Sequence, residues 1–305
     1  MAKFRVYNVQ LLPLEETTQE VGIRGYKTLF SKFQSHNKRI IKERKEGRYH
    51  FRQSEDIFIG PVSDFTFPRG FVYGEFVRYR KVEQVKELGT KRSLFTAGPR
   101  TGVTSEERIA FVFDAQNHLL AIEAPAWLPP SKAFADALAN MLSPIAEQDF
   151  PGYELTIHGL SKKSGLNKVF SSATAYSVID LDLTFRNGHD TEELLQELKD
   201  TRTKSLTVHA SAGKGGRMNR LPHFVKAMVV AAATGLGGAR ITYFAPQQVG
   251  NRIVERQQVY DTRDMPVTFQ VNRTQAATGD AMEFYDRIRG KLSDIHDDLD
   301  DEEEA

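Results

Sequence analysis

The feature that most constrains this chain is the recurrence of short stretches in which apolar and polar residues alternate. They include KFRVYNVQLL (residues 3–12), YHFRQSEDIFIG (49–60) and GFVYGEFVRYR (70–80). RIAFVFDAQNHLLAIEA (108–124) has the pattern of two strands that turn at residues 116–118, where Asn tolerates the required backbone. Alternation of this kind predicts β-strands. The first half of the chain is therefore expected to be rich in strands.

Helical spacing interrupts this pattern at two places. Across residues 15–46, Ile23, Tyr26, Phe30 and Phe33 recur at intervals of three or four and are expected to share one buried helix face. The Pro-rich stretch APAWLPPS then precedes a predicted helix over residues 132–148, with Ser131 as its N-cap.

The strand pattern restarts after residue 149. Five further strands are predicted in YELTIHGL, AYSVIDLDLTF, SLTVHAS, ARITYFA and MPVTFQVNR, and three further helices over residues 190–200, 222–234 and 279–292. Asp190 is the expected N-cap of the first of these helices. The prediction is an α+β fold of two subdomains, residues 1–148 and 149–293, followed by a disordered acidic tail over residues 294–305.

Composition narrows the classes of protein. The chain has 305 residues, of which 40% are hydrophobic, so a folded core is expected. It contains no cysteine, which excludes disulfides, thiolate zinc sites and thiol nucleophiles. The first residues lack the apolar run of a signal peptide, and the longest apolar run, residues 224–239, is shorter than the roughly 20 residues that span a bilayer. We expect a cytoplasmic protein without membrane insertion.

Charge is segregated along the chain. The formal net charge is +1, but residues 294–305 hold eight acids and no Lys or Arg. The remaining 32 acids face 41 bases, so residues 1–293 carry about +9. Two roles for the tail stay open: a solubilising end, or a polyanion that competes for a nucleic-acid surface.

Glycine and cations coincide in SAGKGGRMNR (211–220), between a predicted strand and a predicted helix. The spacing fits neither a Walker A loop, which needs Ser or Thr after the Lys, nor the dinucleotide fingerprint. Backbone amides together with Lys214, Arg217 and Arg220 can still bind an anion such as a nucleic-acid phosphate. The alternative is an ordinary surface loop.

Two other segments are basic. KRIIKERKEGRYHFR (38–52) places Lys38, Lys42 and Lys45 on one helix face, with Arg39 and Arg48 nearby. RYRKVEQVKELGTKRSLFTAGPR (78–100) contributes Arg78, Arg80, Lys91 and Arg92, and TKRSLFTAGPRTGVTSEER (90–108) reads as a long polar connection. These cations are predicted to contact nucleic-acid phosphates, although solvated surface charge is the alternative for each segment.

An enzyme remains a separate hypothesis. Asp180 and Asp182 are two residues apart on a predicted strand, so both carboxylates can face one side and share a divalent metal such as Mg²⁺, as in nucleases. The solvent face of a half-buried strand is the favoured explanation of both residues. No H-x-x-x-H pair or other metal motif is present, and we expect no cofactor unless the nuclease hypothesis holds.

Two stretches, KFRVYNVQLLPLEE and FRQSEDIFIGPVSDF, resemble an uncharacterised bacterial domain-of-unknown-function family associated with phage defence. The order of elements from RIAFVFDAQNHLLAIEAP to SVIDLDLTFRNGHDTEELLQELK is similar to that of the phage lambda Rex exclusion A protein and related defence proteins. These resemblances imply a DNA-binding component of a phage-exclusion system that forms homo-oligomers, with a second defence protein as a further partner.

The leading prediction is therefore a protein that binds DNA or RNA through basic clusters with little sequence specificity. The first alternative is a metal-dependent nuclease that uses Asp180 and Asp182. The second is a protein-interaction or inhibitor protein whose acidic tail mimics nucleic acid.

Overall fold

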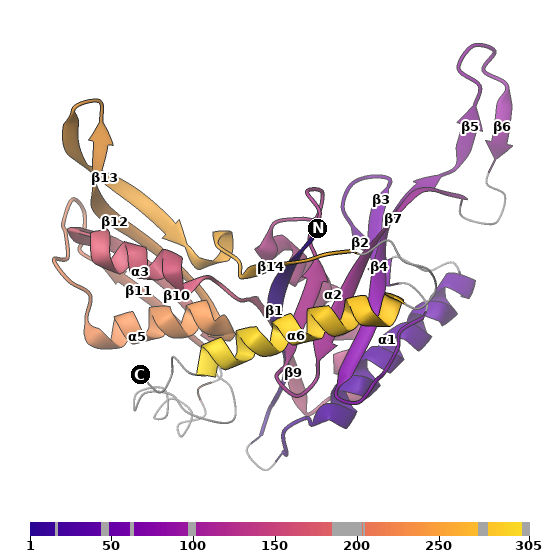
Figure 1. The fold of residues 1–305 in the computed structure, drawn as a ribbon, viewed down its shortest axis with the longest axis horizontal. Coiled ribbons are helices and arrows are strands. Elements are labelled where there is room, and N and C mark those ends of the chain that lie inside the picture. Colours follow the sequence, from indigo (N-terminus) through magenta and orange to yellow (C-terminus); the bar gives the residue numbers. More distant parts are fainter. Residues whose placement is uncertain are drawn as a thin grey trace.

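A computed structural model describes residues 1–15, 18–43, 49–61, 64–96, 102–184, 203, 205–273 and 280–300. It confirms a mixed α+β fold, built on two separate antiparallel sheets (Figure 1). The larger sheet has the order β14-β1-β8-β7-β4-β3-β2, and β9 also pairs with β1. Its strands are β1 (Ala2–Pro13), β2 (Phe51–Arg52), β3 (Ile57–Pro61), β4 (Phe71–Val82), β7 (Gly102–Asp114), β8 (Leu119–Glu123), β9 (Tyr153–Gly159) and β14 (Thr268–Val271).

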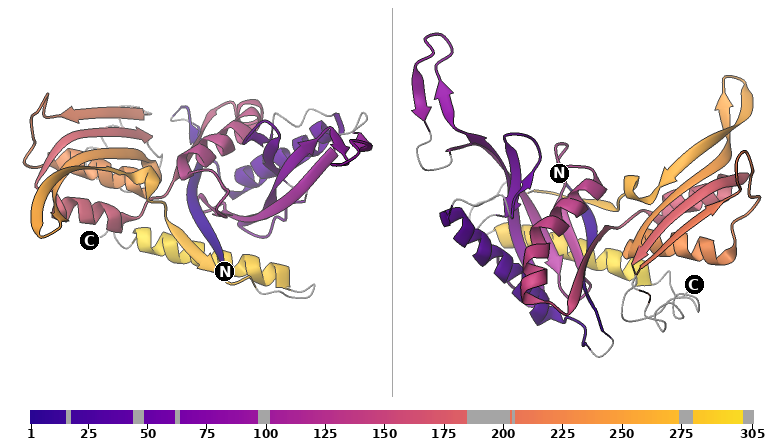
Figure 2. Two further views of the ribbon diagram at one scale, coloured as in Figure 1. Left: turned by 90° about the horizontal axis from the view of Figure 1, so that it is seen from above. Right: turned by 180° about the vertical axis from the view of Figure 1, so that it is seen from behind.

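Both faces of this larger sheet are covered. Helices α1 (Ile23–Glu43) and α2 (Ser131–Asp149) pack on one face, and α6 (Asp280–Asp300) packs on the other, across β7, β8 and β14 (Figures 1 and 2). Strand β1 accordingly sends Phe4 and Val6 to the α6 side and its odd-numbered apolar residues to the α1 and α2 side. A sheet buried on both faces explains why its central strands read as nearly continuous apolar runs.

Helix α1 confirms most of the predicted core face. Tyr26, Phe30 and Phe33 are buried, and the Phe30 ring centroid lies 4.8 Å from that of Phe113 on β7. Ile23 is exposed, because it is the first residue of the helix rather than part of its packed face, so its predicted core position was wrong. Ser131 is likewise not the N-cap of α2: it is the first helical residue, and Pro130 precedes it.

The smaller sheet has the order β11-β10-β12-β13, with strands β10 (Ala175–Thr184), β11 (Ser205–Ser211), β12 (Gly237–Val249) and β13 (Arg252–Asp261). Helices α3 (Lys163–Ser172) and α5 (His223–Ala231), with the π-helical turn η2 (Ala232–Leu236), cover one face. Figure 2, right, looks onto the other face, which no helix of the described ranges covers. Helix α3 and strand β13 were not predicted, and the helix predicted over residues 190–200 lies outside the described residues.

The two sheets do not divide the chain at residue 148. Strands β9 and β14 both pair with β1, so the larger sheet takes its strands from both ends of the chain. The smaller body is an insertion between two crossing segments that hydrogen-bond to each other: the Lys162 amide donates to the Met265 carbonyl at 2.8 Å and the Val267 amide to the Leu160 carbonyl at 2.7 Å. The short turn η3 (Thr262–Asp264) precedes the second crossing.

The predicted acidic tail is partly helical. Helix α6 continues through residues 294–300, because Ile288 and Leu292 are buried against the larger sheet and Ile295 packs beside them. The prediction of disorder from residue 294 was therefore wrong for this stretch, and residues 301–305 lie outside the described residues.

Two β-hairpin arms extend from the molecule. The β5–β6 arm, residues 84–96, consists of β5 (Gln84–Lys86) and β6 (Ser93–Thr96) and continues the long strands β4 and β7. The β12–β13 arm, residues 245–256, comprises the end of β12 and the start of β13. These two segments pair only with each other, because the pairing of β12 with β10 ends at Phe244. Both arms project toward the same side of the molecule, one from each sheet (Figures 1 and 2). The polar connection predicted over residues 90–108 was wrong where the structure describes it, because residues 90–96 belong to the β5–β6 hairpin and residues 102–108 to strand β7.

Candidate nucleic-acid interface

The β5–β6 arm ends in a hydrogen-bonded tip. The Glu87 amide donates to the Arg92 carbonyl at 2.8 Å, and the Lys91 amide donates to the Glu87 carbonyl at 2.9 Å. Lys91 has a φ of 55°, the left-handed conformation that closes the turn. The Thr90 hydroxyl donates to the Glu87 carboxylate. These contacts leave Leu88 and Gly89 at the apex.

The surface of this arm combines positive charge with apolar side chains. Lys86, Lys91 and Arg92 are exposed and have no ion-pair partner within the described parts of the chain. Leu88 is 100% exposed and Leu94 is 64% exposed. The one acid of the arm, Glu87, accepts a hydrogen bond from Thr90 and forms no ion pair with a cation of the described residues, so the arm carries three bases against one acid.

The arm is fastened to the larger sheet at its base. The Phe95 ring lies over Gly102 of β7 so closely that a Cβ there would be 2.7 Å from a ring carbon. Below it, a buried chain of polar side chains joins β4 to α1: the Tyr79 hydroxyl donates to His50 Nδ1 at 2.7 Å, and His50 Nε2 donates to Asn37 Oδ1 at 2.8 Å. These contacts join the base of the arm to β7 and join β4 to α1.

The β12–β13 arm has the same combination of properties. Arg252 and Arg256 are exposed and unpaired among the described residues, and Ile253 is 78% exposed. Gly250 has a φ of 61° and, with Asn251, forms the two-residue turn at the apex. Each arm therefore presents cations and apolar side chains that its own fold does not use.

The Gly-rich loop of residues 211–220 lies against the base of the β12–β13 arm. Arg217 pairs with Glu255 of β13, and its guanidinium carbon stands 3.9 Å from the Phe244 ring centroid. Hydrogen bonds from Thr174 and from Arg217 lower the pKa of the Glu255 carboxyl. Arg217 therefore neutralises the acid of this arm, while Lys214 and Arg220 stay exposed and have no ion-pair partner in the described ranges.

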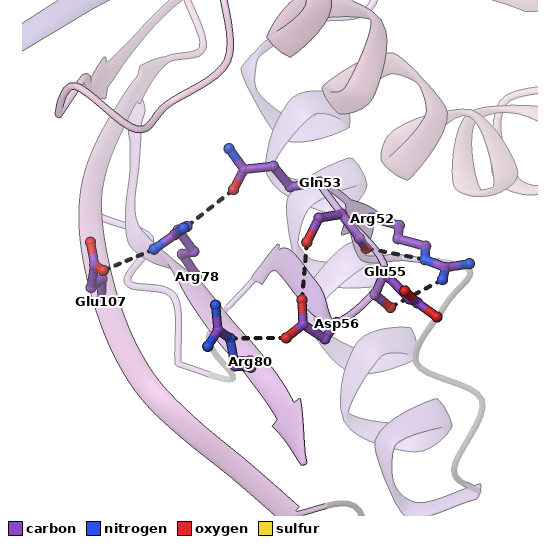
Figure 3. Close-up of polar contacts among 8 residues, drawn as sticks. Arg52, Gln53, Glu55, Asp56, Arg78, Arg80 and Glu107 are labelled. Atoms are coloured by element: carbon purple, nitrogen blue, oxygen red, sulfur yellow. Dashed lines mark hydrogen bonds and ion pairs between the residues drawn. The ribbon is translucent and has the colours of Figure 1, made fainter. Parts of the chain in front are cut away.

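Arg78 and Arg80, two of the predicted phosphate ligands, are engaged within the protein (Figure 3). Arg78 donates to Glu107 at 2.9 Å and to Gln53 at 3.0 Å, and its guanidinium lies over the Trp127 ring. Arg80 pairs with Asp56 at 3.0 Å. Because these partners neutralise both guanidinium groups, Arg78 and Arg80 are not available as phosphate ligands, whereas the cations of the β5–β6 arm are unpaired among the described residues.

Helix α1 carries a third group of predicted ligands. Lys38 pairs with Asp64 at 3.0 Å, whereas Arg39 and Lys42 are exposed and unpaired among the described residues. Lys45 and Arg48 lie outside the described residues. The Gly-rich loop connects β11 to α5. It therefore lies at the opposite end of the molecule's long axis from helix α1 (Figure 1). The three basic segments therefore do not form one continuous surface.

Asp180 and Asp182 lie on the open face of the smaller sheet. Both side chains are exposed while Ile179, Leu181 and Leu183 are buried, as expected of a half-buried strand. Asp180 contacts His209 Nδ1 at 2.7 Å, and Thr207 donates to Asp182 at 3.2 Å. The described residues contain no group of three or more His, Asp or Glu side chains placed to hold a metal ion.

Sequence reasoning missed the arms. The signal for the β12–β13 arm was present as the Gly250-Asn251 pair between the alternating residues of β12 and β13, a two-residue hairpin turn. The β5–β6 arm has a weaker sequence signal, because its strands are short and mostly polar.

Comparison with known proteins assigns a family. Residues 3–289 match the model of DUF4747, a domain of unknown function. Because the match covers nearly the whole described chain, this protein belongs to the DUF4747 family. A search of curated proteins finds no match. No described helix is long and apolar enough to cross a membrane.

Proposed function

We propose that this protein binds duplex DNA with little sequence specificity, holding it between the β5–β6 and β12–β13 arms. The observation that carries the proposal is the pair of arms, which project to the same side and each expose unpaired cations beside apolar side chains. A two-stranded β-ribbon fits a DNA groove, and Lys and Arg along it contact the flanking phosphates.

The arm side chains favour backbone contact over base reading. Lys86, Lys91 and Arg92 project from a short hairpin whose acid is held within its turn. Such cations neutralise phosphates, which carry no sequence information. Duplex RNA is a poorer partner, because its deep, narrow major groove does not admit a two-stranded ribbon, whereas the wider major groove of B-form DNA does.

A direct test compares two matched double variants. Lys91→Ala with Arg92→Ala removes two unpaired cations from the β5–β6 arm, and Arg39→Ala with Lys42→Ala removes two from α1. We expect the arm variant to weaken binding to a fluorescent duplex about tenfold at low salt and the helix variant to bind like the wild type. Equal binding by the wild type and the arm variant contradicts the proposal, and selective loss in the helix variant moves the interface to α1.

We extend the proposal to a role in phage exclusion, which rests on the resemblance of KFRVYNVQLLPLEE and FRQSEDIFIGPVSDF described above. Cells that express the wild type should reduce phage plaque numbers, and cells that express the arm variant should not. Light scattering on the purified protein tests the homo-oligomer that the same resemblance implies.

A further inference from the structure

The apex of the β5–β6 arm exposes a leucine that the fold does not need. Leu88 is fully exposed, whereas the largest side chains of both sheets are packed in their cores. Neighbouring Gly89 has open space around it. A single exposed leucine is ordinary on a protein surface. Its place at the apex of a positively charged hairpin is what calls for an explanation.

The hydrogen bonds of the tip hold this leucine forward. The Glu87–Arg92 and Glu87–Lys91 backbone bonds close the turn, and the Arg92 amide donates to Thr90 Oγ1 at 3.2 Å. Because the turn is closed below the apex, Leu88 leads the arm toward anything that it contacts. In the other arm, Ile253 lies along β13, and the apex is Gly250 and Asn251, which have no apolar side chain.

The surrounding charge indicates what Leu88 meets. Lys86, Lys91 and Arg92 lie within four residues of it and are unpaired in the described structure. An apolar protein pocket would leave these three cations without partners. A DNA duplex satisfies both features, since its phosphates pair with the cations on each side of a groove and its stacked bases accept an apolar side chain.

We propose that Leu88 inserts as a wedge between adjacent base pairs of a bound duplex and kinks it. This inference rests on the proposed DNA binding and adds a consequence to it: bound DNA is bent. Apolar wedges from minor-groove proteins partly unstack one base step and bend the duplex. Flexible pyrimidine–purine steps unstack most easily, so they are the preferred point of insertion.

Fluorescence energy transfer between dyes at the two ends of a duplex of about 30 base pairs tests this proposal. Bending brings the dyes together, so saturating wild-type protein should raise transfer. With Leu88→Ala the increase should be lost and the affinity should fall about tenfold, because the inserted apolar surface is gone. Leu88→Met keeps a long apolar side chain and should restore the bend.

Two controls separate the wedge from other effects. Ile41→Ala truncates an isomeric exposed side chain on α1, outside both arms, and should bend DNA like the wild type. A 2-aminopurine at a central pyrimidine–purine step should brighten with the wild type and stay quenched with Leu88→Ala, since its fluorescence rises on unstacking.

The following results overturn the inference. If the wild type binds duplex without added energy transfer, or if Leu88→Ala bends it equally, the wedge is wrong while the proposed DNA binding stands. If the wild type does not bind duplex at all, both fail. If Leu88→Ala leaves the bend intact and instead changes the oligomeric state, the apex is a contact between copies of this chain.

Discussion

The number of unpaired cations on the two arms predicts how steeply DNA binding depends on salt. Five cations on the arms have no ion-pair partner among the described residues: Lys86, Lys91, Arg92, Arg252 and Arg256. Each phosphate neutralised by a cation contributes about 0.9 to the slope of log K against log salt concentration. If all five contact phosphates, the slope should be about −4.5.

Substitution of arm residues should change this slope by a set amount. Lys91→Ala with Arg92→Ala removes two contacts and should bring the slope to about −2.7. Arg80→Ala is the control, because Arg80 is already paired with Asp56 at 3.0 Å and is not counted among the five. Its slope should stay near that of the wild type.

Fluorescence anisotropy with a labelled duplex between about 50 and 300 mM salt measures these slopes. A wild-type slope shallower than about −2 would refute the count of phosphate contacts. If Arg80→Ala made the slope as shallow as that of the arm variant, paired and unpaired cations would contribute equally to DNA binding. That result would contradict the reasoning from ion pairs.

Three further predictions concern the fold and the acidic end. Gly60→Ala should lower the free energy of unfolding by about 2 to 4 kcal/mol, because its Cβ would lie 2.3 Å from His50 Nδ1, and Tyr79 and Asn37 hold that ring in place. Gly89→Ala, which meets no neighbour, is its control in urea unfolding, and equal stability of the two variants would contradict the clash. Burial lowers the pKa of His158, so below about pH 6.5 the unfolded state binds more protons than the folded state, and the free energy of unfolding falls as the pH falls. His158→Leu should flatten this pH dependence. Parallel curves of unfolding free energy against pH for the variant and the wild type would disprove the prediction. Deletion of residues 301–305 removes four acids that repel DNA, so the affinity for DNA should rise at low salt. An unchanged affinity would show that these acids do not compete with DNA and would favour a role in solubility.

The sequence by itself determined the fold class and much of the core. The strand patterns in residues 3–12 and 108–124 predicted β1, β7 and β8, although helices on both sides of the larger sheet bury both faces of these strands. Tyr26, Phe30 and Phe33 followed from helical spacing in the same way. These features are local, and local periodicity is sufficient to predict them.

Only the tertiary structure decided which cations are free and which segments stand together. Arg78 and Lys91 look alike in the sequence, yet Arg78 lies between Glu107, Gln53 and Trp127, whereas Lys91 projects from a hairpin tip. Strands β9 and β14 pair with β1 from distant parts of the chain, which no local pattern specifies. Ion pairing and strand partnership depend on residues that are far apart in sequence, and for this reason the arms became a candidate site only in three dimensions.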